Sequence, residues 1–126
     1  MIKAGVLLWV ALGGAIGSSL RYIFSMLLQE QSSSGFLYGT LTVNLIGCFL
    51  IGILVGFSIH KPGFISENAK FFLATGLCGG FTTFSAFSAE TFALLDKGDL
   101  LTAGIYVGVS IVAGLLLTGA GIFLVR

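Results

Sequence analysis

Four long apolar segments follow one another along the chain, and short polar stretches separate them. The segments span about residues 4–28, 36–59, 71–95 and 100–125. Each is long enough to cross a bilayer, because about 20 apolar residues in a helix span its hydrocarbon core. The stretches between them are Glu30–Gly35, His60–Lys70 and Asp96–Asp99. We therefore predict an all-α integral membrane protein in which residues 1–126 form one domain of four transmembrane helices.

The third segment is interrupted by glycines and hydroxyl side chains. From Thr75 to Glu90 it reads Thr-Gly-Leu-Cys-Gly-Gly-Phe-Thr-Thr-Phe-Ser-Ala-Phe-Ser-Ala-Glu. Non-helical backbone at membrane depth is tolerated only where protein buries it or where it lines a wet cavity. We expect the helix to break at Gly79–Gly80, with free carbonyl groups on one side that can bind a cation and free N–H groups on the other. This stretch is the predicted functional site.

Phenylalanines alternate with hydroxyl side chains after these glycines. If a helix resumes there, Phe81, Phe84 and Phe87 share one face, since residues three apart are neighbours on a helix. Aromatic ring edges are positive and can contact an anion without trapping it, as conduction requires. Thr82, Ser85 and Ser88 place hydroxyl groups beside the rings. The pattern favours a path for a small anion.

Asn44 is the one carboxamide within a spanning segment. Its NH₂ group can donate to an anion while its carbonyl accepts elsewhere. The alternative is an interhelical hydrogen bond that only joins helices, worth about 0.6 kcal/mol on average. We favour the first interpretation, because an amide is a good anion donor in a dry site.

Two other polar positions leave their roles open. Arg21 continues the helix face of Gly13 and Gly17, and it either extends to the membrane surface or forms a vestibule that attracts anions. The fourth segment carries a stripe of residues four apart, which is either a helix interface or a polar track. The stripe consists of Tyr106, Ser110, Gly114 and Thr118.

The composition agrees with a membrane protein. Of the 126 residues, 56% are hydrophobic and only 9% are charged, whereas soluble domains are about 25% charged. A net charge of +1 offers no basic surface for nucleic acid. Cys48 and Cys78 lack zinc-binding spacing, so we expect buried small side chains. No nucleophile, carboxylate pair or cofactor motif in the sequence indicates an enzyme.

The loop charges give a weak signal of orientation. With four crossings, one side of the membrane holds Lys3, Lys61, Lys70 and Arg126. The other side holds Lys97, with Arg21 if that side chain reaches the surface. Basic residues favour the cytoplasmic side, but so small a bias permits either insertion in both orientations or a slight preference for the N-terminus inside.

Together these residues resemble the Fluc (CrcB) fluoride channels. The resemblance rests on Gly13-x₃-Gly17-x₃-Arg21-Tyr22, on Gly39-Thr-Leu-Thr-Val-Asn44 and on the run from Gly76 to Glu90. It covers the whole chain in order, length and number of segments. The resemblance implies an antiparallel, dual-topology homodimer with two fluoride pores and a structural sodium ion between the subunits. It also implies passive fluoride export that lowers fluoride toxicity, from a bacterial inner membrane.

Carried onto this sequence, the resemblance implies a set of site residues. The pore would be lined by Phe84, Phe87 and Asn44, with hydroxyl donors at Thr83 and Ser85 and a polar track at Tyr106, Ser110 and Thr118. Arg21 would lie at the vestibule. The backbone carbonyls of Gly79 and Thr82 would bind sodium.

Two positions depart from the family pattern. Gly114 stands where serine is common in the track, and Ala86 stands where threonine is common. We expect the track to be interrupted or filled by water at Gly114. Glu90 matches a family carboxylate, and we expect it to form interhelical or vestibular hydrogen bonds, because like charges would keep it from contacting an anion.

Two other classes fit four short membrane helices. A small multidrug-type transporter needs a carboxylate within its first helix for proton exchange, and the first carboxylate here is Glu30, beyond that helix. An accessory subunit held together by glycine packing explains the glycines but not the alternation of phenylalanine and hydroxyl groups.

Overall fold

The computed structural model describes residues 3–30 and 37–126 and contains four helical spans that are long and apolar enough to cross a membrane. The spans are Ala4–Glu30, Tyr38–His60, Glu67–Asp96 and Leu100–Leu124. The predicted all-α membrane fold is confirmed. The predicted polar stretch after Glu30 and the predicted start of the second helix at residue 36 lie outside the described residues.

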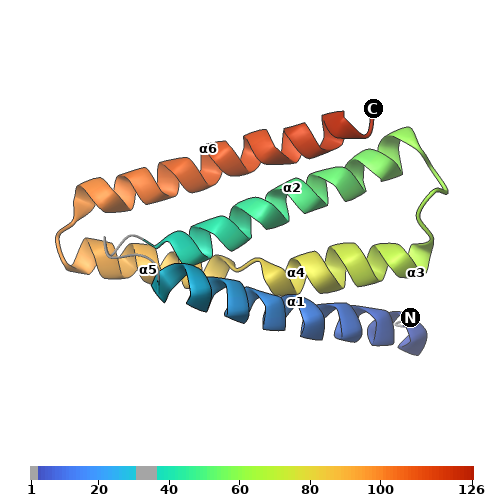
Figure 1. The fold of residues 1–126 in the computed structure, drawn as a ribbon, viewed down its shortest axis with the longest axis horizontal. Helices are drawn as coiled ribbons and strands as arrows, with labels where there is room; N and C mark the ends of the chain where they lie inside the picture. The colour runs from blue at the N-terminus through green and yellow to red at the C-terminus, as the bar shows by residue number, and fades with distance from the viewer. Residues whose placement is uncertain (1–2, 31–36) are drawn as a thin grey trace.

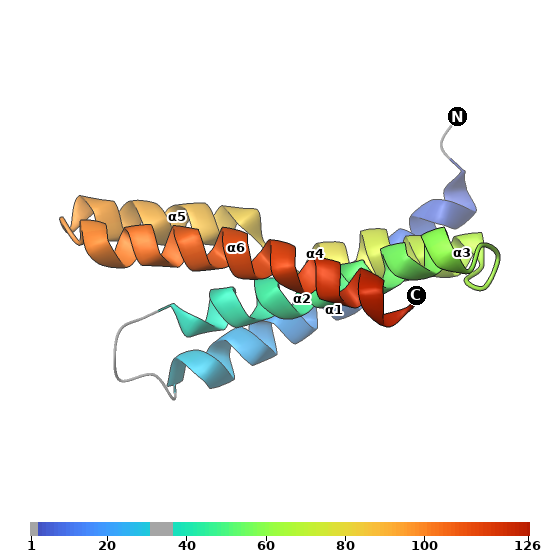
Figure 2. The same ribbon diagram turned by 90° about the horizontal axis from the view of Figure 1, so that it is seen from above.

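The four spans form two helix pairs. Three spans are single helices, namely α1 (Ala4–Glu30), α2 (Tyr38–His60) and α6 (Leu100–Leu124). The third consists of α3 (Glu67–Lys70), the π-helix η1 (Phe71–Cys78), α4 (Gly79–Phe81) and α5 (Phe84–Asp96). Helix α1 packs along η1 and α4, while α2 packs along α6 (Figure 1). Figure 2 shows α5 and α6 running together and diverging from the adjacent ends of α1 and α2.

Glycines let the paired backbones approach closely. A methyl group at Gly80 would lie 2.6 Å from the Gly14 carbonyl oxygen, and one at Gly76 would lie 2.8 Å from the Val10 carbonyl oxygen. In the other pair, a methyl group at Gly121 of α6 would meet the backbone of α2 at Phe49. Small residues at such crossings are the usual means of packing helices in membranes, where lipid removes the hydrophobic drive.

The third span is interrupted at Thr82–Thr83, so the predicted break at Gly79–Gly80 was wrong in position. Gly79 keeps helical angles of φ −63° and ψ −36°, whereas Thr82 and Thr83 are extended, with ψ angles of 159° and 119°. The physical reason is that Gly80 lets the helix pack closely against α1 and remains helical there. Two consecutive β-branched residues then leave the helix, and the Thr83 hydroxyl caps α5 by accepting the Ala86 N–H at 3.2 Å.

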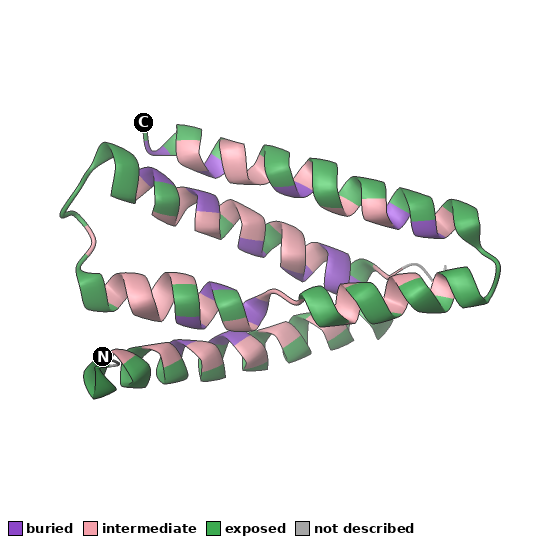
Figure 3. Ribbon diagram, turned by 180° about the vertical axis from the view of Figure 1, so that it is seen from behind, coloured by how far each residue is buried: buried purple, intermediate pink, exposed green. Residues whose placement is uncertain are grey.

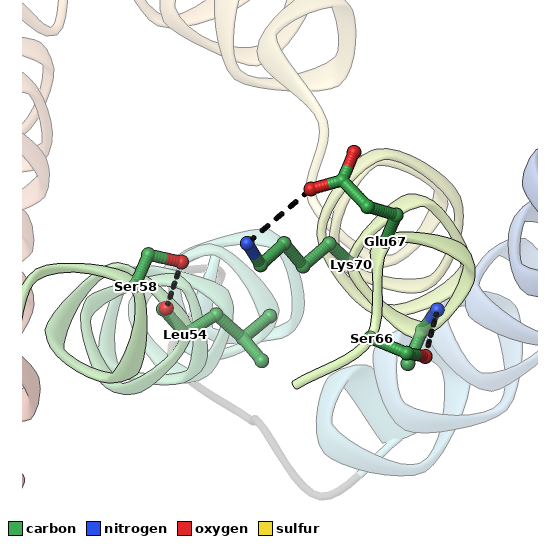
Figure 4. A network of polar contacts seen from close by, with 6 residues as sticks. Leu54, Ser58, Ser66, Glu67 and Lys70 are labelled. Carbon is green, nitrogen blue, oxygen red and sulfur yellow. Dashed lines mark hydrogen bonds and ion pairs between the residues drawn. The ribbon is translucent and has the colours of Figure 1, made fainter. Parts of the chain in front are cut away.

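Local polar contacts define the start of the third span (Figure 4). The Ser66 hydroxyl accepts the Ala69 N–H at 3.3 Å and caps α3, and Lys70 Nζ lies 3.6 Å from Glu67 Oε1. On the facing α2, the Ser58 hydroxyl donates to the Leu54 carbonyl at 3.0 Å. The span therefore begins at Glu67, before the predicted start at residue 71. The apolar pattern could not predict this first turn, because its charged residues carry no apolar signal.

Buried positions follow the contacts between the spans, and the outer faces are exposed (Figure 3). Val43 and Tyr106 are the largest fully buried side chains of the described residues. Many large apolar side chains lie on the outside, such as Leu115 of α6, which is 71% exposed. In a bilayer, these outward side chains contact lipid.

Candidate functional site

The amide of Asn44 holds the interruption of the third span from the α2 side. Asn44 Nδ2 donates to the Thr83 carbonyl at 3.1 Å, and Asn44 Oδ1 accepts the Thr83 N–H at 2.7 Å. One side chain thus pairs both backbone groups of an extended residue, as a neighbouring β-strand would. This matters because an unpaired N–H or C=O at membrane depth costs several kcal/mol.

The interhelical alternative for Asn44 is confirmed, and its role as an anion donor stays a prediction. The amide makes an interhelical contact, from α2 to the third span, and it also lines the cavity described below. An amide nitrogen carries two N–H groups, and Thr83 takes one of them. The second is the donor that an anion in the cavity can use.

Arg21 holds the same interruption from the α1 side. Its Nε donates to the Gly80 carbonyl oxygen at 3.0 Å, in a half-buried contact between residues far apart in the sequence. Gly80 belongs to α4, whose last turn has no helical residues after Phe81 to pair with its carbonyls. Because α1 continues to Glu30, Arg21 lies within the span and turns toward the third span.

A partly open cavity of about 450 Å³ lies beside the interruption. It brings together seven of the residues that the sequence predicted for the site, namely Asn44, Gly79, Thr82, Thr83, Phe84, Phe87 and Ser110. Cys48 and Cys78 also line it, together with Ile51 and Ile111. The cavity therefore collects residues from α2, from both halves of the third span and from α6.

The aromatic residues separate into two groups. Phe84 and Phe87 lie on α5 with their ring centres 5.8 Å apart and their planes tilted by 42°, and the Tyr106 ring lies 5.3 Å from Phe87. Phe81 instead precedes the interruption, is buried, and meets Phe24 of α1 edge-on at 6.0 Å. The predicted shared face of three phenylalanines therefore holds for two of them, because the interruption turns Phe81 away.

Glu90 joins three helices near this aromatic group. The Thr40 hydroxyl of α2 donates to Glu90 Oε1 at 2.6 Å, and the Tyr106 hydroxyl of α6 donates to Oε2 at 2.7 Å. This confirms the expected interhelical role of the carboxylate. The sequence offered no signal for Thr40, which is one of several hydroxyl residues in its segment, although a carboxylate within a span requires donors.

The stripe on α6 divides into two parts. Ser110 lines the cavity, whereas the Thr118 hydroxyl donates to the backbone carbonyls of Cys48 at 3.1 Å and Gly114 at 3.0 Å. A methyl group at Gly114 would lie 3.3 Å from the sulfur of Cys48. The half near Ser110 thus has the character of a polar track, and the half near Thr118 that of a helix interface.

Ser85 and Tyr106, like Arg21 and Thr118, lie outside the cavity lining. The Ser85 hydroxyl is 3.3 Å from the Thr83 hydroxyl at the start of α5 and is exposed. Tyr106 is fully buried behind Phe87. The π-helix η1 is a feature that sequence reasoning missed, because its apolar residues differ in no visible way from an α-helical run. In it the Gly79 N–H reaches back to Ala74, and such turns are often found at functional sites.

The carbonyl groups at the interruption have the chemistry of a cation site. Among the described residues, no group of three His, Cys, Asp or Glu side chains could hold a metal ion. Gly79 and Thr82 line the cavity, and no hydrogen bond between described residues ends on their carbonyl oxygens. Carbonyl oxygens of unwound segments bind Na⁺ in transporters, so these two residues fit a sodium ion.

Comparison with known proteins identifies the family of this chain. Residues 8–122 match the protein family described as "CrcB-like protein, Camphor Resistance (CrcB)". The chain belongs to the CrcB family. Among its similar relatives, "Fluoride-specific ion channel FluC" of Flavobacterium psychrophilum is 42% identical over 118 residues, which cover 94% of each chain. The protein of the same name from Methylobacillus flagellatus is 50% identical over 118 residues, covering 93% of this chain and 91% of its own.

Membership of the CrcB family accounts for two predictions. The relatives are named as ion channels, which agrees with a protein that is not an enzyme. The four spans and the bacterial relatives agree with a multi-pass membrane protein. The family thereby replaces the multidrug-type transporter and the accessory subunit that the sequence left open.

Proposed function

We propose that this chain is a fluoride-selective channel that lets fluoride leave the cytoplasm passively and so lowers its toxicity. The observation that carries the proposal is the convergence of Asn44, Phe84, Phe87 and Ser110 on one cavity. It is supported by relatives that are themselves named as fluoride-specific channels.

The cavity supplies donors in place of water. Fluoride is small and strongly hydrated, so a conducting site must replace its water without holding the ion too tightly. The remaining N–H of Asn44 and the Ser110 hydroxyl are hydrogen-bond donors, and the positive edges of Phe84 and Phe87 add weaker contacts. The N-terminus of α5 also points its partial positive charge toward this region.

A second subunit completes the site in this proposal. Free carbonyls and hydroxyl groups beside an open cavity cannot face lipid, because hydrocarbon offers them no hydrogen bonds. Phe84 is 79% exposed in the single chain, although it lines that cavity. An antiparallel copy related by a two-fold axis would cover both and bring the Gly79 and Thr82 carbonyls of two chains around one sodium ion. The ion would be structural and would neutralise the facing carbonyl dipoles.

Fluoride efflux from liposomes tests the function. Purified protein is reconstituted in vesicles loaded with potassium fluoride, valinomycin carries the counterion, and an electrode follows fluoride release. We expect fast fluoride release and no release from vesicles loaded with potassium chloride. Well-folded protein that releases no fluoride would refute the proposed function.

Two matched variants test the contribution of the rings. Phe87→Ile removes a cavity-lining ring, whereas Phe92→Ile changes a 69% exposed residue on the same helix that does not line the cavity. We expect Phe87→Ile to lower fluoride efflux about tenfold, since aromatic contacts are worth roughly 0.5–1.5 kcal/mol. Phe92→Ile should conduct as the wild type does. Equal efflux from all three proteins would remove the rings from the mechanism.

A further inference from the structure

We propose that Arg21 is a positioning residue for the cation site, which rests on the sodium ion of the proposed function. By holding the Gly80 carbonyl on the α1 side, Arg21 leaves the Gly79 and Thr82 carbonyls as the oxygens presented to the ion. Arg21 itself touches neither the ion nor the cavity.

The contacts around the interruption give two of its carbonyls a hydrogen-bond partner. Gly80 lies against α1, where a methyl group at its position would meet Gly14, and its carbonyl accepts from Arg21 at 3.0 Å. Gly79 and Thr82 lie on the other side and line the cavity. The carbonyl that follows the interruption, at Thr83, is taken by Asn44 at 3.1 Å. Two side chains therefore remove two carbonyls from the set available to a cation.

The Arg21 contact also fixes the end of α4. The Thr82 N–H and the Thr82 hydroxyl both donate to the Cys78 carbonyl, at 3.0 and 2.9 Å, so the position of Thr82 depends on the last turn of α4. Carbonyls in a last turn have no helical partners and fray easily. A charged donor on Gly80 opposes that fraying, because hydrogen bonds from charged groups are stronger than neutral ones.

The positive charge of Arg21 lowers the affinity for sodium by repulsion, whereas its hydrogen bond to Gly80 raises that affinity by orienting the ligands. A guanidinium near the site repels a second cation, so removal of the charge alone would strengthen sodium binding. Loss of a residue that orients metal ligands typically weakens metal affinity about 10–100-fold. We infer that orientation outweighs repulsion here, because the Nε–H points at a carbonyl within the same turn as Gly79.

Sodium binding to the purified full-length protein tests this inference. Equilibrium binding of ²²Na⁺ is measured with N-methyl-D-glucamine as the replacement cation, on wild type, Arg21→Gln, Arg21→Lys and Arg126→Gln. Lysine keeps the charge but carries its nitrogen one bond farther from the backbone than Nε. Arg126 is the matched control, because it lies at the C-terminus over the Phe123 ring, away from the interruption.

We expect Arg21→Gln and Arg21→Lys to raise the sodium dissociation constant about tenfold or more, with Arg126→Gln unchanged. Wild-type sodium affinity in Arg21→Lys would show that a positive charge is sufficient and that the direction of the Nε–H bond does not matter. Unchanged or tighter sodium binding in Arg21→Gln would show that the repulsion between the guanidinium and sodium dominates. Either result overturns the inference. If Arg21→Gln does not fold, the charge-conserving Arg21→Lys carries the test.

The same preparations separate this inference from the proposed function. A merely structural Arg21 would lower thermal stability equally at every sodium concentration and leave the dissociation constant unchanged, which also overturns the inference. Wild type that conducts fluoride but binds no ²²Na⁺ overturns the inference and leaves the channel function standing. Wild type that binds ²²Na⁺ but conducts no fluoride refutes the function alone.

Discussion

Asn44 uses both ends of its side-chain amide on the backbone of one residue, Thr83. The sequence predicted that a carboxamide within a span needs partners inside the protein, and it placed Asn44, Phe84 and Phe87 in one site. It could not predict which backbone groups Asn44 pairs with, because that depends on where the third span is interrupted. A pairing between residues of two helices has no local signature in the chain.

The amide of Asn44 predicts the effect of a charge change. Asn44→Asp keeps the acceptor for the Thr83 N–H but loses both N–H donors and adds a negative charge to the cavity. Two like charges about 4 Å apart repel by roughly 4 kcal/mol at an effective dielectric constant of about 20, so we expect fluoride efflux to fall at least about a hundredfold. Asn68→Asp, on an exposed position of α3, is the matched control and should conduct normally. Comparable efflux in the two variants would exclude Asn44 from the anion path.

At the scale of helices, the chain uses its glycines for packing and its threonines for the interruption. Periodicity and length predicted the four spans, because bilayer thickness dictates both. The position of the interruption was not predictable from glycine content, since glycine permits a close helix contact as readily as it permits a bend. Gly80 packs against Gly14. Whether a glycine forms a contact or a bend therefore depends on the neighbouring helix.

This division of roles predicts different effects for two glycines. Gly80→Ala places a methyl group 2.6 Å from the Gly14 carbonyl oxygen, and we expect a loss of about 1–3 kcal/mol in the free energy of unfolding. Gly108→Ala on α6 meets nothing within 4 Å and should be neutral or should stabilise the helix by up to about 1 kcal/mol. Unfolding in mixed detergent, followed by Trp9 fluorescence, measures both. A Gly80→Ala protein as stable as Gly108→Ala would contradict the packing role.

At the scale of the whole molecule, most basic side chains lie at one end. The start of α1, the end of α6 and the α2–α3 connection lie at one end (Figure 1) and carry Lys3, Arg126, Lys61 and Lys70. The other end has Lys97. Arg21 does not add to either count, because it donates to Gly80 within the span. The orientation signal therefore comes from four basic residues against one, and insertion in both orientations stays a prediction.

Removal of Lys97 should make the orientation one-sided. Reporters fused after Arg126, one fluorescent only in the cytoplasm and one active only outside it, should both give signal in the wild type. In Lys97→Gln, we expect the cytoplasmic reporter to gain and the external one to fall, since basic residues favour the cytoplasmic side. Lys61→Gln removes a charge from the opposite end and should shift the ratio in the other direction. A ratio that neither variant changes would show that these charges do not set orientation.

The two side chains that hold the interruption, Asn44 and Arg21, belong to the same chain as the backbone they hold. A newly synthesised subunit can therefore complete its shape alone, soon after it enters the bilayer. In the proposed antiparallel dimer, pairing would then join two finished surfaces and demand no further folding. Biogenesis of the proposed dimer would be a search within the plane of the membrane, and its rate would depend on how often oppositely inserted copies meet.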